Sequence, residues 1–209
     1  MYQPSHFRED DPKTLHALMR AHPLGLLISG GPGLLANPVP FELAVGADGA
    51  ASLRCHLARP NAQWQALAGA PEVLVVFQGA DTYITPSWYE TKKRTGKAVP
   101  TWNYVTVQAR GTARLIEDPA WLLAHLHALT GTHEAGRPEP WAVDDAPPDY
   151  IAAQLRGIVG VEIAITALEG KWKVGQNRPE ADRLGMLDGL AQTPGQGPAT
   201  IAGLLRERS

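Results

Sequence analysis

The alternation of apolar and polar residues is the main structural signal along the 209-residue chain. Period-two alternation predicts strands, whereas apolar residues three and four positions apart predict amphipathic helices. On these patterns we expect strands at 24–29, 34–45, 51–58, 72–78, 81–86, 101–117 and 159–168. Pro38 and Pro40 confine the second strand to a sheet edge, a bulge or a ligand-facing margin, because proline cannot donate to a strand ladder.

Helix signals lie between these strands. Asp11-Pro12 and Asp118-Pro119 each combine an N-cap acceptor with a proline in the first turn, which is typical of a helix start. His22-Pro23 ends the first helix, because the residue before a proline disfavours helical backbone angles. Further helices are expected at 60–67, 149–156, 179–187 and 199–208.

Tight turns connect most of the expected strands, and the helices are inserted among them. This order is typical of a closed antiparallel barrel with helical decoration, so the predicted fold class is mainly β with helices (α+β). We expect one domain over residues 1–190 and a linker with a short C-terminal helix over 191–209. Residues 90–98, which hold four of the cations, are expected to form an exposed loop.

Composition narrows the class of protein. The net charge is 19 − 21 = −2 with neutral histidines, which does not favour non-specific binding of nucleic acid. The single cysteine, Cys55, excludes an intramolecular disulfide and a cysteine-rich metal site. No apolar run approaches the roughly 18 residues that span a bilayer, and residues 1–7 do not form a signal peptide. We therefore expect a cytoplasmic protein without a membrane partner.

Two polar, aromatic clusters are the strongest candidates for a ligand site. One runs from Gly170 to Arg178 and combines two lysines, a tryptophan, two amides and an arginine. The other is Val99-Pro100-Thr101-Trp102-Asn103-Tyr104, at the start of the longest expected strand. Donors, aromatic faces and positive charge together suit a flat, anionic, heteroaromatic ligand. The alternative is that each cluster is an aromatic anchor on the protein surface.

A third candidate is the junction between a strand and a helix at residues 56–64. The strand places His56 and Arg59 near the start of the expected helix, and Asn61 adds a neutral donor. Free backbone N–H groups favour an anion there, and a guanidinium can hold phosphate with two hydrogen bonds. The same pattern is explained equally well if Arg59 is an ordinary surface residue and Asn61 belongs to the first helical turn.

Five segments, taken together, resemble the PaiB-type proteins, which are described as FMN-binding negative transcriptional regulators. They occur in the same order between Met1 and about Leu187, at 1–7, 56–64, 83–89, 99–104 and 160–178. The last three are long and specific. Gly175 and Thr85 depart from the pattern, because many relatives have serine at both positions.

The resemblance implies a split β-barrel that binds FMN, similar in fold to flavin reductases and pyridoxamine-phosphate oxidases. It also implies a homodimer with the flavin at the subunit interface. The implied cofactor-binding residues are Asn37, Val39, His56, Leu57, Ala58, Arg59, Asn61, Trp64, Pro100, Thr101, Trp102, Asn103, Lys171, Trp172, Lys173, Gln176, Asn177 and Arg178.

Within this set the resemblance suggests separate roles. Arg59 and Asn61 are the candidates for the FMN phosphate. Lys173 and Arg178 are the candidates for the cation that stabilises reduced flavin near N1 and O2. Trp102 or Trp172 stacks on the flavin ring or, alternatively, packs across the dimer interface.

Three functions remain open from the sequence: a flavin-binding regulator, an FMN-dependent oxidoreductase or haem-degrading enzyme, and a binding module without turnover. DNA as a partner is supported only by the cations of residues 92–97, and His6 is the only N-terminal imidazole available to a haem iron. No catalytic residue is identified. No metal site is expected, because His125 and His127 are two positions apart on a helix and do not face each other.

Overall fold

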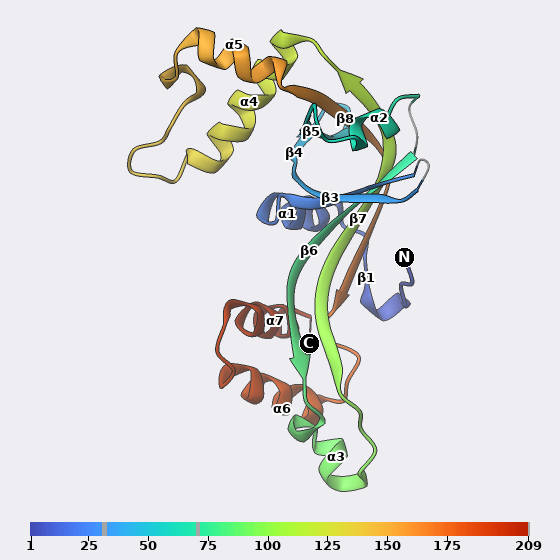
Figure 1. Cartoon of the computed structure of the whole chain (residues 1–209). Helices are drawn as coiled ribbons and strands as arrows, with labels where there is room; N and C mark the ends of the chain where they lie inside the picture. Colours follow the sequence, from blue (N-terminus) through green and yellow to red (C-terminus); the bar gives the residue numbers. More distant parts are fainter. Residues whose placement is uncertain (31–32, 70–71, 209) are drawn as a thin grey trace. The chain divides into compact units, whose positions relative to one another are not determined.

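Figure 1 shows the computed structural model, in which residues 1–30, 33–69 and 72–208 are described. The strands are β1 (Arg8–Glu9), β2 (Leu24–Ser29), β3 (Leu35–Pro40), β4 (Glu42–Val45), β5 (Ala51–Ala58), β6 (Glu72–Ile84), β7 (Thr101–Ile116) and β8 (Ile158–Lys173). The helices are α1 (Pro12–Ala21), α2 (Gln63–Ala66), α3 (Glu90–Thr95), α4 (Pro119–Glu134), α5 (Pro148–Arg156), α6 (Glu180–Ala191) and α7 (Gln196–Glu207). Three short 3-10 helices lie at Ser5–Phe7, Pro86–Trp88 and Val143–Asp145.

The strands form an antiparallel sheet in the order β3-β2-β6-β7-β8-β5-β4, and β1 pairs with β8. β3 lies at one end of this order, so of the three positions that Pro38 and Pro40 allow, an edge, a bulge or a ligand-facing margin, it has the edge. The strand expected at 34–45 is in fact two strands, because the chain leaves the β2 ladder at Phe41 and β4 then pairs with β5. β3 also contacts β5, so the sheet curls toward a barrel.

The chain divides into two compact units. Unit 1 consists of Met1–Leu18, Gln78–Val107 and the chain from Glu169 onward, and unit 2 consists of Met19–Phe77 and Gln108–Leu168. The long strands β6, β7 and β8 contribute residues to both units. The division of the chain at residue 190 that the sequence predicts stays a prediction.

In unit 2 the core lies on one face of β5. Leu53, Cys55 and Leu57 are buried there, and burial raises the pKa of the Cys55 thiol. The intervening residues of β5 point to the opposite face, since side chains alternate along a strand. Helix α4 contacts both β4 and β5 and contributes the buried Leu122 and His125. The face of β5 that carries Arg54 and His56 therefore meets side chains from α4.

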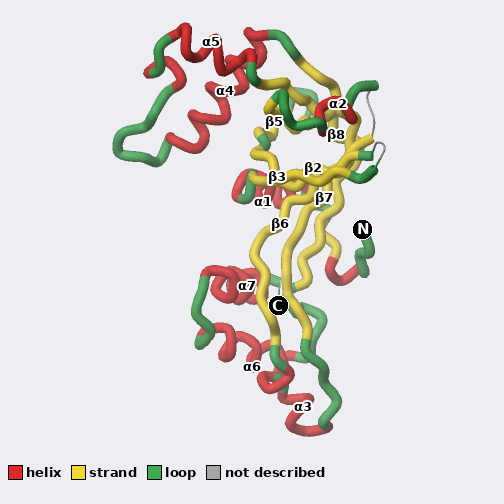
Figure 2. The backbone as a smooth tube through the Cα atoms, viewed as in Figure 1, coloured by secondary structure: helices red, strands yellow, loops and turns green. Residues whose placement is uncertain are grey.

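In unit 1 the helices α6 and α7 lie side by side, as Figures 1 and 2 show. Helix α7 is three residues longer at its start than the helix expected at 199–208. Ile201, Ala202 and Leu205 of α7 are buried, and Met186 and Leu190 of α6 are buried as well. The C-terminal helix therefore packs on its own chain through an apolar face.

Three other expected elements differ from the structure. Residues 90–98 are not a loop throughout, because Glu90–Thr95 forms α3 and Gly96 ends it with a φ of 71°. The strands expected at 72–78 and 81–86 are one strand, β6. The strand expected at 159–168 continues to Lys173 as β8, so the first part of the 170–178 cluster is strand and not loop. In the described residues no helix is long and apolar enough to cross a membrane.

Candidate functional site

Strand β8 places two lysines on the same face in unit 1. Lys171 and Lys173 are two positions apart, so both side chains point to one side of the strand and Trp172 points to the other. The Lys171 ammonium lies 5.3 Å from the ring centre of Tyr2 and 5.4 Å from that of Tyr104. It also donates to the carbonyl oxygen of Tyr2 at 3.0 Å. Lys171 is thus held between two aromatic rings.

Lys173 connects β8 to the start of β7. Its ammonium lies 5.8 Å from the Tyr104 ring centre and donates to Thr101 Oγ1 and to the carbonyl oxygen of Trp102. Burial lowers the pKa of Lys173, and the charges of Lys171 and Arg178 lower it further. We call Lys171, Lys173, Tyr2, Tyr104 and Thr101 the lysine–aromatic cluster. The two segments that the sequence singled out, 99–104 and 170–178, meet in this cluster.

The two tryptophans of these segments have different surroundings. Trp102 is 55% exposed and lies edge-on to Tyr83, with 6.0 Å between the ring centres. Trp172 is buried, and the Arg208 guanidinium lies 5.4 Å from its ring centre. Trp102 is therefore the tryptophan of the two that presents an open ring face for stacking. Pro100 precedes β7 and is exposed.

The turn after β8 is held by an amide. Gln176 Oε1 accepts from the Val174 N–H at 3.0 Å, and its Nε2 donates to the carbonyl oxygens of Trp172 and His6. Gly175 has a φ of 95°, a conformation that residues with a side chain rarely adopt. A Cβ there would lie 2.5 Å from Met186 Cε. These restraints explain why glycine suits this position.

Asn103 has an unsatisfied donor. Its side chain is 2% exposed, and its Nδ2 has no hydrogen-bond partner in the described part of the chain. Nδ2 lies 3.4 Å from the position that a Cβ would take at Gly175. Because a buried unpaired donor costs roughly 1–3 kcal/mol, it marks a place where a ligand or water supplies an acceptor.

Arg178 lies against the start of α3. Its guanidinium is 4.8 Å from the ring centre of Tyr89, which is buried. Burial raises the pKa of Tyr89, and the charge of Arg178 opposes this shift. Asn177 next to it is exposed. Unit 1 thus combines three cations, open and buried aromatic rings and an unpaired amide donor.

In unit 2 a buried amide links the candidate residues of β3 and the 58–64 segment. Gln63 is 1% exposed; its Oε1 accepts from Asn37 Nδ2 at 2.9 Å, and its backbone N–H donates to Asn61 Oδ1 at 3.0 Å. Its Nε2 donates to the carbonyl oxygen of Leu27 and to Ser29 Oγ. The sequence analysis did not single out Gln63, because a glutamine in a short helix resembles an ordinary surface residue.

Arg59 is already paired in this structure. Its Nη2 lies 2.8 Å from Glu117 Oε2, and its Nε donates to the carbonyl oxygen of Arg156 at 2.8 Å. Trp64 Nε1 donates to the carbonyl oxygen of Arg59 at 2.9 Å. Ala58 is exposed, whereas the side chains of Val39 and Leu57 are buried, so these two residues offer only backbone groups to a ligand.

A chain of three titratable side chains lies between α4 and the sheet. His56 Nδ1 is 3.2 Å from His125 Nε2, and His125 Nδ1 is 3.1 Å from Glu42 Oε2. His125 is buried and stacks on Trp121 with 5.4 Å between the ring centres. We call Glu42, His125 and His56 the His–His–Glu chain. Sequence reasoning placed only His56 in a site, because the three positions are far apart in the sequence.

Three further charges lie beside this chain and, together with Glu42, sum to zero. Arg54 pairs with Glu162 at 3.0 Å and lies 3.8 Å from Glu42, and Arg114 pairs with Glu162 at 2.7 Å. Hydrogen bonds from Arg114 and Arg54 lower the pKa of Glu162 against the opposing effect of burial. Two arginines thus face two carboxylates. His127 is separate from this group and lies 3.6 Å from Asp144, and no group of side chains in the described ranges has the composition of a metal site.

Comparison with known proteins agrees with the fold and the candidate ligand. Residues 1–167 match the family described as "Putative FMN-binding domain". An uncharacterized protein of Emericella nidulans is 34% identical over all of this chain and 97% of that protein. The protease synthase and sporulation protein PAI 2 of Bacillus subtilis is 28% identical over all of this chain and 98% of that protein.

Solved structures show the same fold. The flavocytochrome Anf3 of Azotobacter vinelandii superposes with a TM-score of 0.60 at 17% identity, over 85% of this chain and 75% of that one. The FAD and heme binding protein of Mycobacterium smegmatis gives 0.58 at 19% identity, over 79% of this chain and 73% of that one. The chain therefore has the split β-barrel fold, and it belongs to the PaiB-type family of FMN-binding proteins.

Proposed function

We propose that the protein holds FMN against the lysine–aromatic cluster of unit 1. The observation that carries this proposal is the pair of ammonium groups of Lys171 and Lys173 against the Tyr104 ring, next to the exposed Trp102. An anionic, hydrogen-bond-accepting ring system fits this donor set, because it supplies both an acceptor and negative charge. FMN, when bound, supplies reversible electron transfer through its ring system.

Different residues of unit 1 have different binding roles in this proposal. Lys173 and Arg178 provide the positive charge, and the buried Asn103 is an unpaired donor on the other face of β7. Trp102 offers its exposed face for stacking. Thr101 and the backbone of Trp102 fix the ammonium of Lys173, which is oriented before a ligand arrives.

Binding measurements with matched variants test this site. Lys173→Met removes the charge and keeps the length of the side chain, so the dissociation constant for FMN should rise about tenfold or more, as the loss of a charge-assisted contact predicts. Arg178→Met is the second variant, and Lys13→Met, which is exposed on α1, is the control. Flavin fluorescence reports binding and circular dichroism reports folding. Folded Lys173→Met and Arg178→Met proteins that bind FMN as the wild type does would contradict the assignment.

We propose that Arg59 and Asn61 of unit 2 contact the FMN phosphate. The support is local: Asn61 and Asn37 are joined through the buried Gln63, and Arg59 adjoins them with its guanidinium on an exposed carboxylate. A phosphate that binds Arg59 replaces Glu117, whose side chain is 62% exposed and readily solvated.

The assembly we propose is a homodimer. In unit 1 Tyr83, Val99 and Trp102 are large and exposed, next to residues of the lysine–aromatic cluster. Burial of such side chains by a second copy removes apolar surface from water, which favours association. Light scattering should give the mass of two chains, and a Trp102→Asp variant should shift the protein toward one chain. A wild-type protein with the mass of a single chain would contradict this assembly.

We propose that the flavoprotein has a regulatory function that involves contact with DNA. The curated relative PAI 2 is named a protease synthase and sporulation protein, and α3 with the residue after Gly96 presents the exposed cations Lys92, Lys93, Arg94 and Lys97. An exposed group of cations suits contact with phosphate groups of nucleic acid.

A DNA-binding experiment distinguishes this regulatory function from catalysis. Binding to the DNA upstream of its own coding region should weaken steeply as salt rises, and Lys92→Glu/Arg94→Glu should weaken it further, whereas Lys13→Glu should not. Turnover of FMN with a nicotinamide donor and no DNA binding would instead favour the oxidoreductase. The cytoplasmic location expected from the sequence stays a prediction.

A further inference from the structure

The hydrogen bonds of the His–His–Glu chain in unit 2 have a defined donor and acceptor at each step. An ionised carboxylate only accepts hydrogen bonds, so Glu42 requires His125 to donate from Nδ1. In a neutral imidazole the other nitrogen is then an acceptor, and His125 Nε2 faces His56 Nδ1. His56 therefore carries its proton on Nδ1 and presents the lone pair of Nε2.

The surroundings offset the charge of Glu42 and disfavour a charge on the imidazoles. Arg54 lies 3.8 Å from Glu42, and Arg54 and Arg114 both pair with Glu162, so the two arginines and the two carboxylates together carry no net charge. Burial lowers the pKa of His56, and the neighbouring His125 lowers it further. Burial likewise lowers the pKa of His125, although Glu42 opposes that shift. A lasting charge on either imidazole is thus disfavoured.

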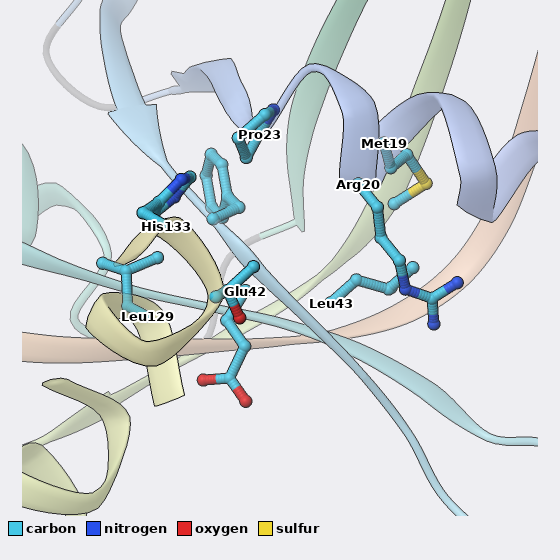
Figure 3. A pocket seen from close by; sticks show the side chains of 9 residues that line it. Met19, Arg20, Pro23, Glu42, Leu43, Leu129 and His133 are labelled. Carbon is cyan, nitrogen blue, oxygen red and sulfur yellow. The ribbon is translucent and has the colours of Figure 1, made fainter. Parts of the chain in front are cut away.

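The two ends of the chain are more accessible than its middle. His125 is almost fully buried, whereas His56 is partly exposed. At the other end Glu42 lines a cavity of about 120 Å³, together with Arg20, Leu43 and His133 (Figure 3). Such a cavity has room for a few water molecules, since each occupies about 30 Å³ in the liquid. Both ends of the chain are thus closer to solvent than His125 is.

We propose that Glu42, His125 and His56 form a proton relay, in which His56 Nε2 takes a proton from an O–H or N–H group of a bound ligand and Glu42 receives one at the cavity. The relay can be tested without FMN, and no oxidant or reductant takes part. His56 is the group that touches the ligand. His125 and Glu42 act through it as positioning and proton-accepting residues.

Each bond in the relay balances. An N–H bond forms at His56 Nε2 while the one at Nδ1 breaks and its proton passes to His125 Nε2. The N–H bond at His125 Nδ1 then breaks, and its proton passes to Glu42 Oε2. Both imidazoles end neutral with the proton on Nε2, and both hydrogen bonds of the chain are kept with their direction reversed. The charge left on the ligand is matched by the charge lost at Glu42.

Imidazole nitrogen NMR of the labelled full chain tests the relay directly. Near pH 8 both His56 and His125 should show a protonated Nδ1 and a bare Nε2. His125→Phe keeps a ring against Trp121 but removes the acceptor for His56. The neutral tautomer of His56 should then change from one protonated on Nδ1 toward one protonated on Nε2. His127→Gln, on the same helix and outside the chain, should leave His56 unchanged.

Glu42→Gln supplies a second variant, because an amide cannot take up the proton. The pH at which His56 and His125 become protonated should fall, since the added charge loses its carboxylate partner. In the wild type the two histidines should titrate together, as coupled groups do. A wild-type His56 protonated on Nε2, a tautomer that survives His125→Phe, or a Glu42→Gln protein that titrates as the wild type does would each overturn the relay.

Discussion

At the residue scale, two anions compete for the Arg59 guanidinium: the Glu117 carboxylate and the FMN phosphate. Its partner in the structure, Glu117, is largely exposed, and exposed ion pairs contribute roughly 0.2–1 kcal/mol. A charge-assisted contact with phosphate is worth more, about 1.5–3 kcal/mol. The phosphate should therefore displace Glu117 when FMN binds.

Paired substitutions at these two residues give opposite expectations. Arg59→Ala should weaken FMN binding about tenfold or more, because a charge-assisted contact is lost. Glu117→Gln should strengthen binding slightly, because Arg59 no longer has to leave a carboxylate. Titration calorimetry with FMN measures both effects. Equal affinities for Arg59→Ala, Glu117→Gln and wild type would mean that Arg59 is an ordinary surface residue.

The candidate residues of unit 1 show what residue-level reasoning can and cannot predict. The sequence indicated a ligand site at 99–104 and 170–178 from its donors and cations, and Lys173 does contact Thr101 and Trp102. The strand periodicity of β8, once it is extended to Lys173, also explains why Lys171 and Lys173 share one face and Trp172 points to the other. Gln63 and His125 were missed because their polar partners come from other elements of the tertiary structure.

At the element scale, α7 stabilises unit 1 through its buried apolar face. Leu205→Ala should lower the free energy of unfolding by about 2–5 kcal/mol, because the side chain is fully buried and its loss leaves a cavity. Leu184→Ala on α6 makes the same change at a side chain that is 56% exposed, and it should have little effect. Urea denaturation gives both values. Equal effects of the two substitutions would mean that α7 does not pack on α6 in solution.

Element boundaries follow from local signals where those signals are strong. The Asp-Pro starts of α1 and α4 and the bounds of β2 and β5 agree with the sequence patterns. Helix α3 was wrongly predicted as a loop, because its dense charge hid a short run of helix-forming residues that ends at Gly96. The break at Phe41 could not be predicted, since the apolar pattern continues through it and only strand pairing changes.

At the scale of the whole molecule, the two buried histidines predict how stability depends on pH. Burial lowers the folded-state pKa of His56 and of His125 below the ordinary value of 6.5. Below that pH the unfolded chain therefore binds more protons than the folded chain, so stability is lost as the pH falls. Urea midpoints between pH 8 and pH 5 should decrease, and His56→Gln should make the decrease shallower. A wild-type midpoint that rises on acidification would contradict this expectation.

The family and the fold come from the chain as a whole, whereas the ligand site depends on a few residues. The PaiB-type resemblance and the split barrel rest on matches along most of the chain. The family match ends at residue 167, before Lys171, Lys173 and Arg178. The lysine–aromatic cluster therefore needs a test that does not rely on similarity.

The visible absorption spectrum of the purified protein, after loading with FMN and desalting, tests the central claim most directly. We expect a retained flavin band, displaced or structured relative to free FMN, and a clear loss of that band in Lys173→Met but not in Lys13→Met. A wild-type protein that leaves the column colourless would show that the lysine–aromatic cluster does not hold FMN.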